Sequence, residues 1–508
     1  MENLQLLLHG FEGALSFANL TSAVLGALLG TIVGVLPGLG PAATLALLIP
    51  VAFSMRPDTA LIMMTAVYAG SMYGGSLTSV LLRVPGEAAS VMTALDGFEM
   101  AKQGRAGSAL AISAIGSWIG GVVALGGIVF LAPPLAEFAL KFGPTEYFAV
   151  MLAALMLSAA MMGGSIVKSA IAICLGLMIS TVGTDLQTGV PRFTMGVTEL
   201  LDGVEFLSVI VGIFGVGEVL WYFREIRQGG ASAERLALKG RLWPSKQEFR
   251  DSAGPIGRGT VIGFLAGVLP GAGPIMASVI SYMTEKRLSR HPERFGQGAI
   301  EGVAAAETSN NAASAGAMIP TLTLGIPATG TTAVMMGALM MWGIRPGPML
   351  FTEQADLVWT VLASMLISNV ILLILNLPLI GMFVKILDIS PKFLMPAIIA
   401  LAVVGAYATN NSMIDVYLVI LFGVVGYFMR LIGLPPAALV LALVLGDRFE
   451  QSLRQSMQLS GGHPVVFLTS PISAVALAVG LFAVVWDATK GYRNKKKAAK
   501  AAAHEPAA

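Results

Sequence analysis

The chain has 508 residues, of which 56% are hydrophobic and only 12% are charged. Soluble domains carry about 25% charged residues, so this composition excludes an ordinary soluble protein. The net charge of +2 selects neither acidic nor basic partners, and a single cysteine excludes an intrachain disulfide.

Apolar stretches recur along the whole chain and approach the ~20 residues with which a helix crosses a bilayer. We therefore predict an all-α polytopic membrane protein with about 10–12 transmembrane helices plus re-entrant hairpins. The hydrophobic segments are 16–50, 59–82, 108–131, 145–163, 166–183, 204–223, 259–283, 299–324, 328–343, 357–383, 393–409, 413–431, 434–446 and 466–487.

The first and seventh segments are interrupted by nearly the same octapeptide. "GVLPGLGP" begins at Gly34 and "GVLPGAGP" begins at Gly267, an offset of 233 residues. Further on, "YGGSLTSVLLRVPGEAAS" (73–90) is similar to "AGAMIPTLTLGIPATGTT" (315–332), where Pro85 matches Pro327 at an offset of 242. Two landmarks in the same order predict an internal duplication.

The charges divide the chain and orient its parts. We predict a first membrane half (1–223), a basic cytoplasmic linker (224–258), a second membrane half (259–487) and a basic cytoplasmic tail (488–508). Basic residues flank the second octapeptide segment on both sides, whereas acidic residues precede the first, so the positive-inside rule favours inverted repeats. The tail "YRNKKKAAK" could also be a nucleic-acid or anionic-lipid patch, but behind a membrane helix it is more simply a topology determinant, and we expect no nucleic-acid partner.

The paired glycine–proline breaks suggest a binding site. Proline and glycine end helices, and within a bilayer a broken helix persists only where protein or water satisfies its backbone. Matched breaks in two halves indicate the binding site of a transporter, because the ends of half-helices direct free N–H groups at an anion. The alternative is a packing role, in which small residues let helices approach closely.

A polar stretch, "AAAETSNNAASAGAMIPTLTLGIPATGTT" (304–332), lies beside the second pair of breaks. Its amides and hydroxyls can donate to carboxylates and offer oxygen ligands to a cation. We predict that substrate binds through Pro37, Gly38, Gly40, Pro270, Gly271, Gly273, Ser309, Asn310, Asn311, Pro327, Thr329, Gly330 and Thr331. The predicted cation-coupling residues are Glu307, Thr308 and Glu87, for Na⁺ or H⁺; alternatively, Glu307 caps a helix or faces a water-filled vestibule.

No enzyme motif is present. The four histidines are scattered without metal-ligand spacing, and neither a GxxxxGK[ST] loop nor a GxSxG turn occurs. We therefore expect no catalytic residues, no metal site and no cofactor apart from a coupling Na⁺ or H⁺.

Three stretches resemble the large membrane subunit of the bacterial tripartite tricarboxylate transporters. They are "GTIVGVLPGLGPAATLALLIP", "GVLPGAGPIMASVISYMTEKRLSRHPERFGQGAIEGVAAAETSNNAASAGAMIPTLTLGIPATGTTA" and "MMWGIRPGPMLF". The resemblance covers roughly residues 10 to 490 and leaves out the basic tail.

This resemblance implies a secondary importer of di- and tricarboxylates in the bacterial inner membrane, driven by an ion gradient. It also implies two protein partners, a small four-helix membrane subunit and a periplasmic solute-binding protein, while membrane lipid surrounds the chain and a homodimer is left open. The competing hypotheses are a channel or carrier for another small organic anion, an intramembrane enzyme and a receptor.

Overall fold

The structure is a computed structural model and describes residues 2–36, 40–162, 165–185, 187–227, 241–386 and 391–502. The chain forms two compact units. Unit 1 comprises Met1–Leu140 and Val204–Phe428, and unit 2 comprises Lys141–Gly203 and Met429–Ala508. The predicted boundaries at 223, 258 and 487 stay predictions, and residues 228–240 of the linker and 503–508 of the tail lie outside the described residues.

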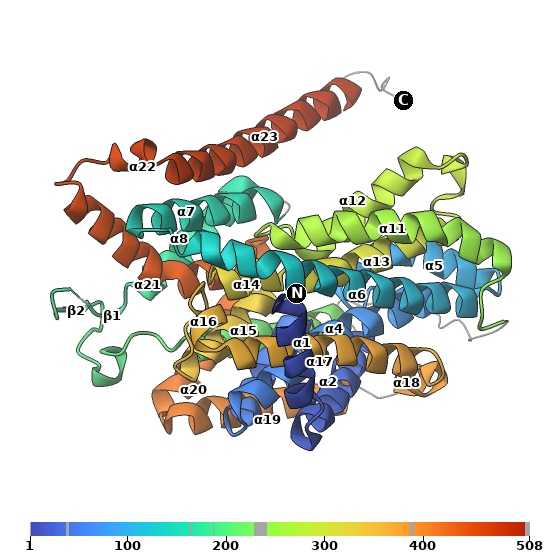
Figure 1. The fold of residues 1–508 in the computed structure, drawn as a ribbon, viewed down its shortest axis with the longest axis horizontal. Helices are drawn as coiled ribbons and strands as arrows, with labels where there is room; N and C mark the ends of the chain where they lie inside the picture. The colour runs from blue at the N-terminus through green and yellow to red at the C-terminus, as the bar shows by residue number, and fades with distance from the viewer. Residues whose placement is uncertain are drawn as a thin grey trace. The chain divides into compact units, whose positions relative to one another are not determined.

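The regular elements of unit 1 among its described residues are all helices (Figure 1). Its first part contains α1 (Glu2–Ala14), α2 (Phe17–Val35), α3 (Pro41–Phe53), α4 (Pro57–Leu82), the 3₁₀ turn η1 (Ala88–Val91), α5 (Thr93–Lys102) and α6 (Ala106–Ala139). Its second part contains α9 (Phe206–Ile210), the π-helical turn η3 (Val211–Val216), α10 (Gly217–Arg227), α11 (Lys246–Val268), α12 (Gly273–Leu288), η4 (Pro292–Arg294), α13 (Ile300–Gly316), α14 (Met318–Thr323), α15 (Gly330–Met341), α16 (Leu350–Glu353), α17 (Ala355–Asn376), α18 (Ile380–Ile386), α19 (Pro391–Asn410) and α20 (Met413–Ile432), which passes into unit 2 after Phe428.

Unit 2 combines helices with one short antiparallel strand pair. Its elements are α7 (Pro144–Met161), α8 (Ile166–Ser180), β1 (Gly183–Thr184), β2 (Pro191–Arg192), η2 (Thr198–Leu200), α21 (Pro436–Leu459), α22 (Val466–Thr469) and α23 (Pro471–Ala502). In the strand pair Gly183 lies opposite Arg192, and Thr184 lies opposite Pro191.

The fold class is confirmed. Among the described residues, seven helices are long and apolar enough to cross a membrane, and four shorter helices are apolar as well. The seven are Phe17–Val35, Ala106–Ala139, Pro144–Met161, Phe206–Arg224, Ala355–Asn376, Met413–Ile432 and Pro471–Thr489. Several helices begin at a proline, which suits the first turn because proline lacks the N–H that this turn leaves unpaired. Pro41, Pro57 and Pro144 are the first residues of α3, α4 and α7.

Two helix pairs in unit 1 pack in the same way, backbone against backbone. In each pair, three glycines spaced four residues apart face the backbone of the partner helix, so that an added Cβ atom would lie 2.3–3.0 Å from a carbonyl oxygen. In the first pair, Gly26, Gly30 and Gly34 of α2 face Met63, Val67 and Ser71 of α4. In the second pair, Gly259, Gly263 and Gly267 of α11 face Ala305, Ser309 and Ala313 of α13.

The two pairs are related by the offsets found in the sequence. Each glycine of α11 lies 233 positions after its equivalent in α2, and each partner in α13 lies 242 positions after its equivalent in α4. These are the offsets of the two repeated sequence landmarks. The repeated packing therefore supports the predicted duplication, whereas the inverted orientation stays a prediction.

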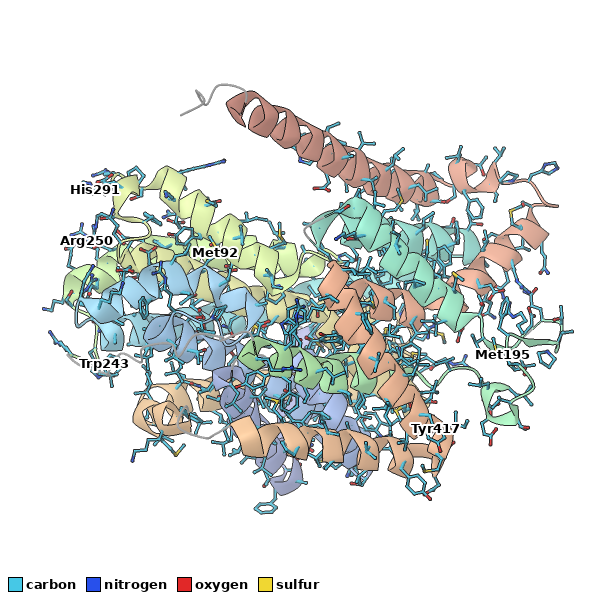
Figure 2. The ribbon with its side chains drawn as sticks, turned by 180° about the vertical axis from the view of Figure 1, so that it is seen from behind. Met92, Met195, Trp243, Arg250, His291 and Tyr417 are labelled. Atoms are coloured by element: carbon cyan, nitrogen blue, oxygen red, sulfur yellow. The ribbon has the colours of Figure 1, made fainter. Side chains whose placement is uncertain are left out.

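Helices from both halves of the chain meet at one end of unit 1. There α5 packs on α4 and α13, and α13 packs on α11 and α12. Figure 2 labels Arg250, His291 and Trp243 at this end, with Met92 further in. Met92 belongs to a buried cluster with Tyr282 and Phe295, which joins the turn before α5 to the α12–α13 connection.

Candidate functional site

The second broken helix meets the tip of the α11–α12 hairpin. Helix α14 ends at Thr323 and α15 begins at Gly330. Gly325 between them has a positive φ of 66°, a conformation that glycine adopts without strain. The backbone N–H of Gly271 at the tip donates to the carbonyl of Ala328, 2.9 Å away. The structure thus brings the predicted stretch around Pro327 together with the tip residues.

The start of α15 is a capped helix N-terminus. The Thr329 hydroxyl accepts from the backbone N–H of Thr332 at 3.1 Å, and the Thr332 hydroxyl accepts from the N–H of Thr329 at 3.0 Å. Both Thr329 and Gly330 are half-buried, and Thr331 is buried. Gly273 at the tip has a positive φ of 53°, and a Cβ there would lie 3.0 Å from the Thr329 side chain.

The first repeat has an equivalent break between Leu82 and η1. Gly86 in this break lies directly against the end of α2, because a Cβ on Gly86 would lie 2.0 Å from the carbonyl oxygen of Gly34. Glu87 caps η1 and accepts from the N–H of Ala89 at 2.6 Å. Of the first-repeat residues predicted from the octapeptide, Gly40 precedes α3 as its N-cap residue, whereas Pro37 and Gly38 lie outside the described residues.

The carboxylate of Glu307 occupies the centre of a buried polar cluster. Glu307 is 0% exposed on α13. It accepts hydrogen bonds from the hydroxyls of Ser76 (2.6 Å) and Thr93 and from the side-chain amide of Asn310 (3.3 Å). Ser76 lies on α4 and Thr93 on α5, so the first half of the chain supplies both hydroxyls.

Asn311 extends the cluster to α6. Its side-chain amide nitrogen lies 2.8 Å from the hydroxyl of Ser117 and 2.7 Å from the side-chain oxygen of Asn310. The hydroxyl of Ser117 donates in turn to the backbone carbonyl of Glu307 at 3.3 Å. The predicted pair Asn310 and Asn311 therefore lies together with Glu307, and α6 fixes its orientation.

Thr308 and Ser309 face other helices. Thr308 lies against α6, where a Cβ on Gly116 would lie 2.5 Å from its hydroxyl oxygen, and that hydroxyl is buried without a hydrogen-bond partner. Ser309 faces Gly263 of α11, and its hydroxyl donates to the carbonyl of Ala306 at 3.0 Å. The structure thus brings Glu307, Asn310 and Asn311 together and separates the other two residues from them.

Three further ionisable groups lie at the cluster or at the break beside it. Tyr73 of α4 lies close enough to Glu307 to interact electrostatically, and its buried hydroxyl has no hydrogen-bond partner. Glu87 interacts electrostatically with Glu307, and the Tyr68 hydroxyl faces Thr329 and Glu87. None of the described side chains that bind the Glu307 carboxylate is basic. Among the described residues, no group of three or more His, Cys, Asp or Glu side chains could hold a metal ion.

A second buried carboxylate joins the two halves near the start of α13. Asp96 of α5 accepts from the backbone N–H groups of Gly296, Gly298 and Ala299, each at 2.8 Å, and from the Tyr282 hydroxyl at 2.7 Å. The α12–α13 connection is therefore fixed to the first half of the chain.

An ion pair supports this junction from α11. The Arg105 guanidinium of the α5–α6 turn lies 2.7 Å from the Glu248 carboxylate. Burial alone would raise the pKa of Glu248, but hydrogen bonds from Ser245 and Arg105 hold that pKa below its ordinary value. Glu248 therefore stays charged at neutral pH and keeps the ion pair intact.

The sequence reasoning missed Ser76, Thr93 and Ser117. Isolated serines and threonines are common in apolar helices and carry no pattern that marks a ligand. Their role is visible only once α4, α5 and α6 lie against α13, more than 190 positions away in the chain.

Comparison with known proteins assigns the family. The family model described as the tripartite tricarboxylate transporter TctA family matches residues 20–441. The chain belongs to this TctA family. As a family member it is a multi-pass membrane component of a tripartite transport system.

Two relatives come from Agrobacterium vitis. The "uncharacterized 52.8 kDa protein in TAR-I ttuC' 3'region" is 47% identical over 487 residues, which cover 96% of each chain. The "uncharacterized protein in TAR-II ttuC' 3'region" is 48% identical over 234 residues, which cover 46% of this chain and 97% of the relative. No solved structure matches this TctA-family chain.

Proposed function

We propose that this chain is the carrier subunit of a secondary importer of di- and tricarboxylates, driven by a gradient of Na⁺ or H⁺. The observation that carries the proposal is the junction of the broken helix before α15 with the tip of the α11–α12 hairpin, beside a buried polar cluster. The hydrogen bond from Gly271 to Ala328 closes this junction. Such junctions of broken helices form binding sites in secondary transporters.

The substrate carboxylates would bind at the start of α15. The first backbone N–H groups of a helix have no partner within the helix and, together with the helix dipole, favour an anion. At α15 these groups belong to Gly330 and Thr331, next to the hairpin tip. The amides of Asn310 and Asn311 would supply further polar groups, and Glu307 and Glu87 would couple ion binding to substrate binding.

The proposal includes two protein partners and a location. A small membrane subunit would pair with the chain, and a periplasmic solute-binding protein would deliver the carboxylate. The chain would lie in the bacterial inner membrane with its basic C-terminal tail in the cytoplasm. We propose no enzymatic activity, because transport needs no bond of the substrate to break.

Uptake by proteoliposomes tests the function. The full chain, reconstituted with the two partner subunits, should accumulate radiolabelled citrate or succinate when a Na⁺ or H⁺ gradient is imposed. It should also catalyse counterflow, the exchange of internal for external carboxylate, which a carrier performs and a channel does not. Absence of both activities, with intact protein in the membrane and a panel of di- and tricarboxylates tested, would refute the proposal.

A pair of asparagine variants tests the site. Asn311→Ala removes the amide that binds Ser117 and Asn310, so we expect uptake to fall without loss of the protein from the membrane. The matched control is Asn376→Ala, because Asn376 is a buried asparagine of α17 whose amide donates to the carbonyl of Leu372 one helical turn earlier. Equal uptake by the two variants would contradict the assignment.

A further inference from the structure

Glu307 is a buried carboxylate whose described partners are all neutral. Its oxygens accept from two hydroxyls and one amide, and no Lys, Arg or His is among these partners. A charge buried without a counter-charge is costly, so such a group is stable only when it is neutral or when it takes up a cation. The cluster is therefore built to receive one positive charge.

From this arrangement we infer that Glu307 binds the coupling ion as a proton, and that Ser76 and Thr93 position its carboxyl group in both protonation states. The inference rests on the proposed function, because it names the ion that drives this carrier. It also goes beyond that proposal, because it assigns a positioning role to Ser76 and Thr93, two residues from the opposite half of the chain.

The partners of Glu307 fit a proton better than a sodium ion. A sodium ion is bound by several oxygen lone pairs, such as the carbonyls of unwound segments. At Glu307 the Asn310 side chain turns its N–H toward the carboxylate, while its oxygen lies 2.7 Å from the amide of Asn311. The Asn310 oxygen, which could be a sodium ligand, is thus paired with Asn311 and does not face the carboxylate.

Hydroxyl groups can serve both states of a carboxyl group. Ser76 and Thr93 donate to the charged carboxylate, and after rotation about the C–O bond either hydroxyl can accept from the protonated acid. Binding then forms one O–H bond on Glu307 with a proton from water, and release breaks that bond and returns the proton to water. No heavy atom needs to be replaced in either step.

The titratable neighbours of Glu307 come from several helices. Tyr73 of α4 and Glu87 before η1 interact with it electrostatically, and Glu87 is half-buried at the break and so closer to water. The groups facing the start of α13 are paired among themselves: Asp96 of α5 with Tyr282 of α12, and Arg258 of α11 with Glu285 of α12. Glu87 is thus the titratable group of this set that lies at the break.

Infrared spectroscopy of the purified full chain tests the inference without substrate. On acidification we expect a carboxylic-acid C=O band that is missing in Glu307→Gln. In Thr93→Val, loss of one charge-assisted hydrogen bond should move the pH midpoint of this band upward by about one to two pH units, and Thr93→Ser should restore it. The control is Thr260→Val, since the Thr260 hydroxyl donates to the carbonyl of Ile256 in its own helix.

Transport assays distinguish a failure of this inference from a failure of the proposed carrier function. If Glu307 carries the proton, a pH gradient alone drives accumulation of citrate or succinate, and Glu307→Gln loses accumulation to a greater degree than counterflow. If carboxylate accumulation depended on a Na⁺ gradient and not on a pH gradient, the inference would be overturned while the carrier function remained intact. A wild-type band that Glu307→Gln retains, or a midpoint unchanged in Thr93→Val, would overturn it as well.

Discussion

The contact of Gly263 with Ser309 predicts that one methyl group at this position destabilises the protein. A Cβ on Gly263 would lie 2.3 Å from the carbonyl oxygen of Ser309, and ordinary contact begins at 3.4 Å, so α11 and α13 must separate by about 1 Å. Overpacking of this kind costs roughly 1–3 kcal/mol. Replacing glycine by alanine inside a helix returns about 1 kcal/mol of helix propensity. We therefore expect Gly263→Ala to lower the free energy of unfolding by about 0–2 kcal/mol.

The same helix provides the control. Gly257 is exposed on α11, and a Cβ there would meet no atom within 4 Å. Gly257→Ala should therefore raise the free energy of unfolding by about 1 kcal/mol. The stabilities of the two variants should then differ by about 1–3 kcal/mol.

Circular dichroism during thermal unfolding of the purified full chain in detergent compares the stabilities of the two variants. The unfolding midpoint of Gly263→Ala should lie below that of Gly257→Ala. If Gly263→Ala were as stable as Gly257→Ala, the close backbone contact between α11 and α13 would be wrong.

Three further predictions follow from the contacts of single residues. Asp96→Asn leaves one side-chain oxygen for the three backbone N–H groups, but it removes the charge and puts an NH₂ group where the second oxygen accepts from the Tyr282 hydroxyl; this should cost roughly 1–3 kcal/mol of stability, which faster proteolysis of the α12–α13 connection would show. Gly86→Ala would place a Cβ 2.0 Å from the carbonyl oxygen of Gly34 and should abolish uptake at normal membrane abundance; normal uptake would contradict it. In unit 2, the N–H groups of Thr188 and Gln187, followed by Arg454, lower the pKa of Asp185 to about 2. This stabilisation is present above about pH 4 and is lost as the pH falls toward 2, so Asp185→Asn should flatten the acid side of the unfolding profile, and an unchanged slope would count against it.

The sequence predicted the helical class and the duplication, because both leave periodic signals. Hydrophobic length predicts membrane helices, and the repeated octapeptide predicts matched breaks. Among the described residues, α2 ends at Val35 and α11 ends at Val268, both just inside an octapeptide, and the glycines that lead into and begin each octapeptide make equivalent contacts.

The predicted site was less accurate in its geometry, for a reason that lies in the helix itself. Consecutive residues of an α-helix point about 100° apart, so a run of polar residues cannot face one ligand. Glu307, Asn310 and Asn311 share a face through their spacing of three and four, whereas Thr308 and Ser309 point toward α6 and α11. The hydroxyl partners from α4 and α5 could not be predicted, because nothing local in a sequence specifies which distant helix will lie against it.

The hydrogen bonds around Glu307 and Asp96 also bear on the history of a duplicated chain. Glu307 takes both of its hydroxyl partners from the opposite half, and Asp96 takes all four of its partners from there, so neither half could fully satisfy its own buried carboxylate if it were produced alone. Under the predicted duplication, two copies that began as equals have thereby come to depend on each other. A substitution at Ser76 or Thr93 is constrained by Glu307 in the other half, so the two halves of the chain can diverge at these positions only together.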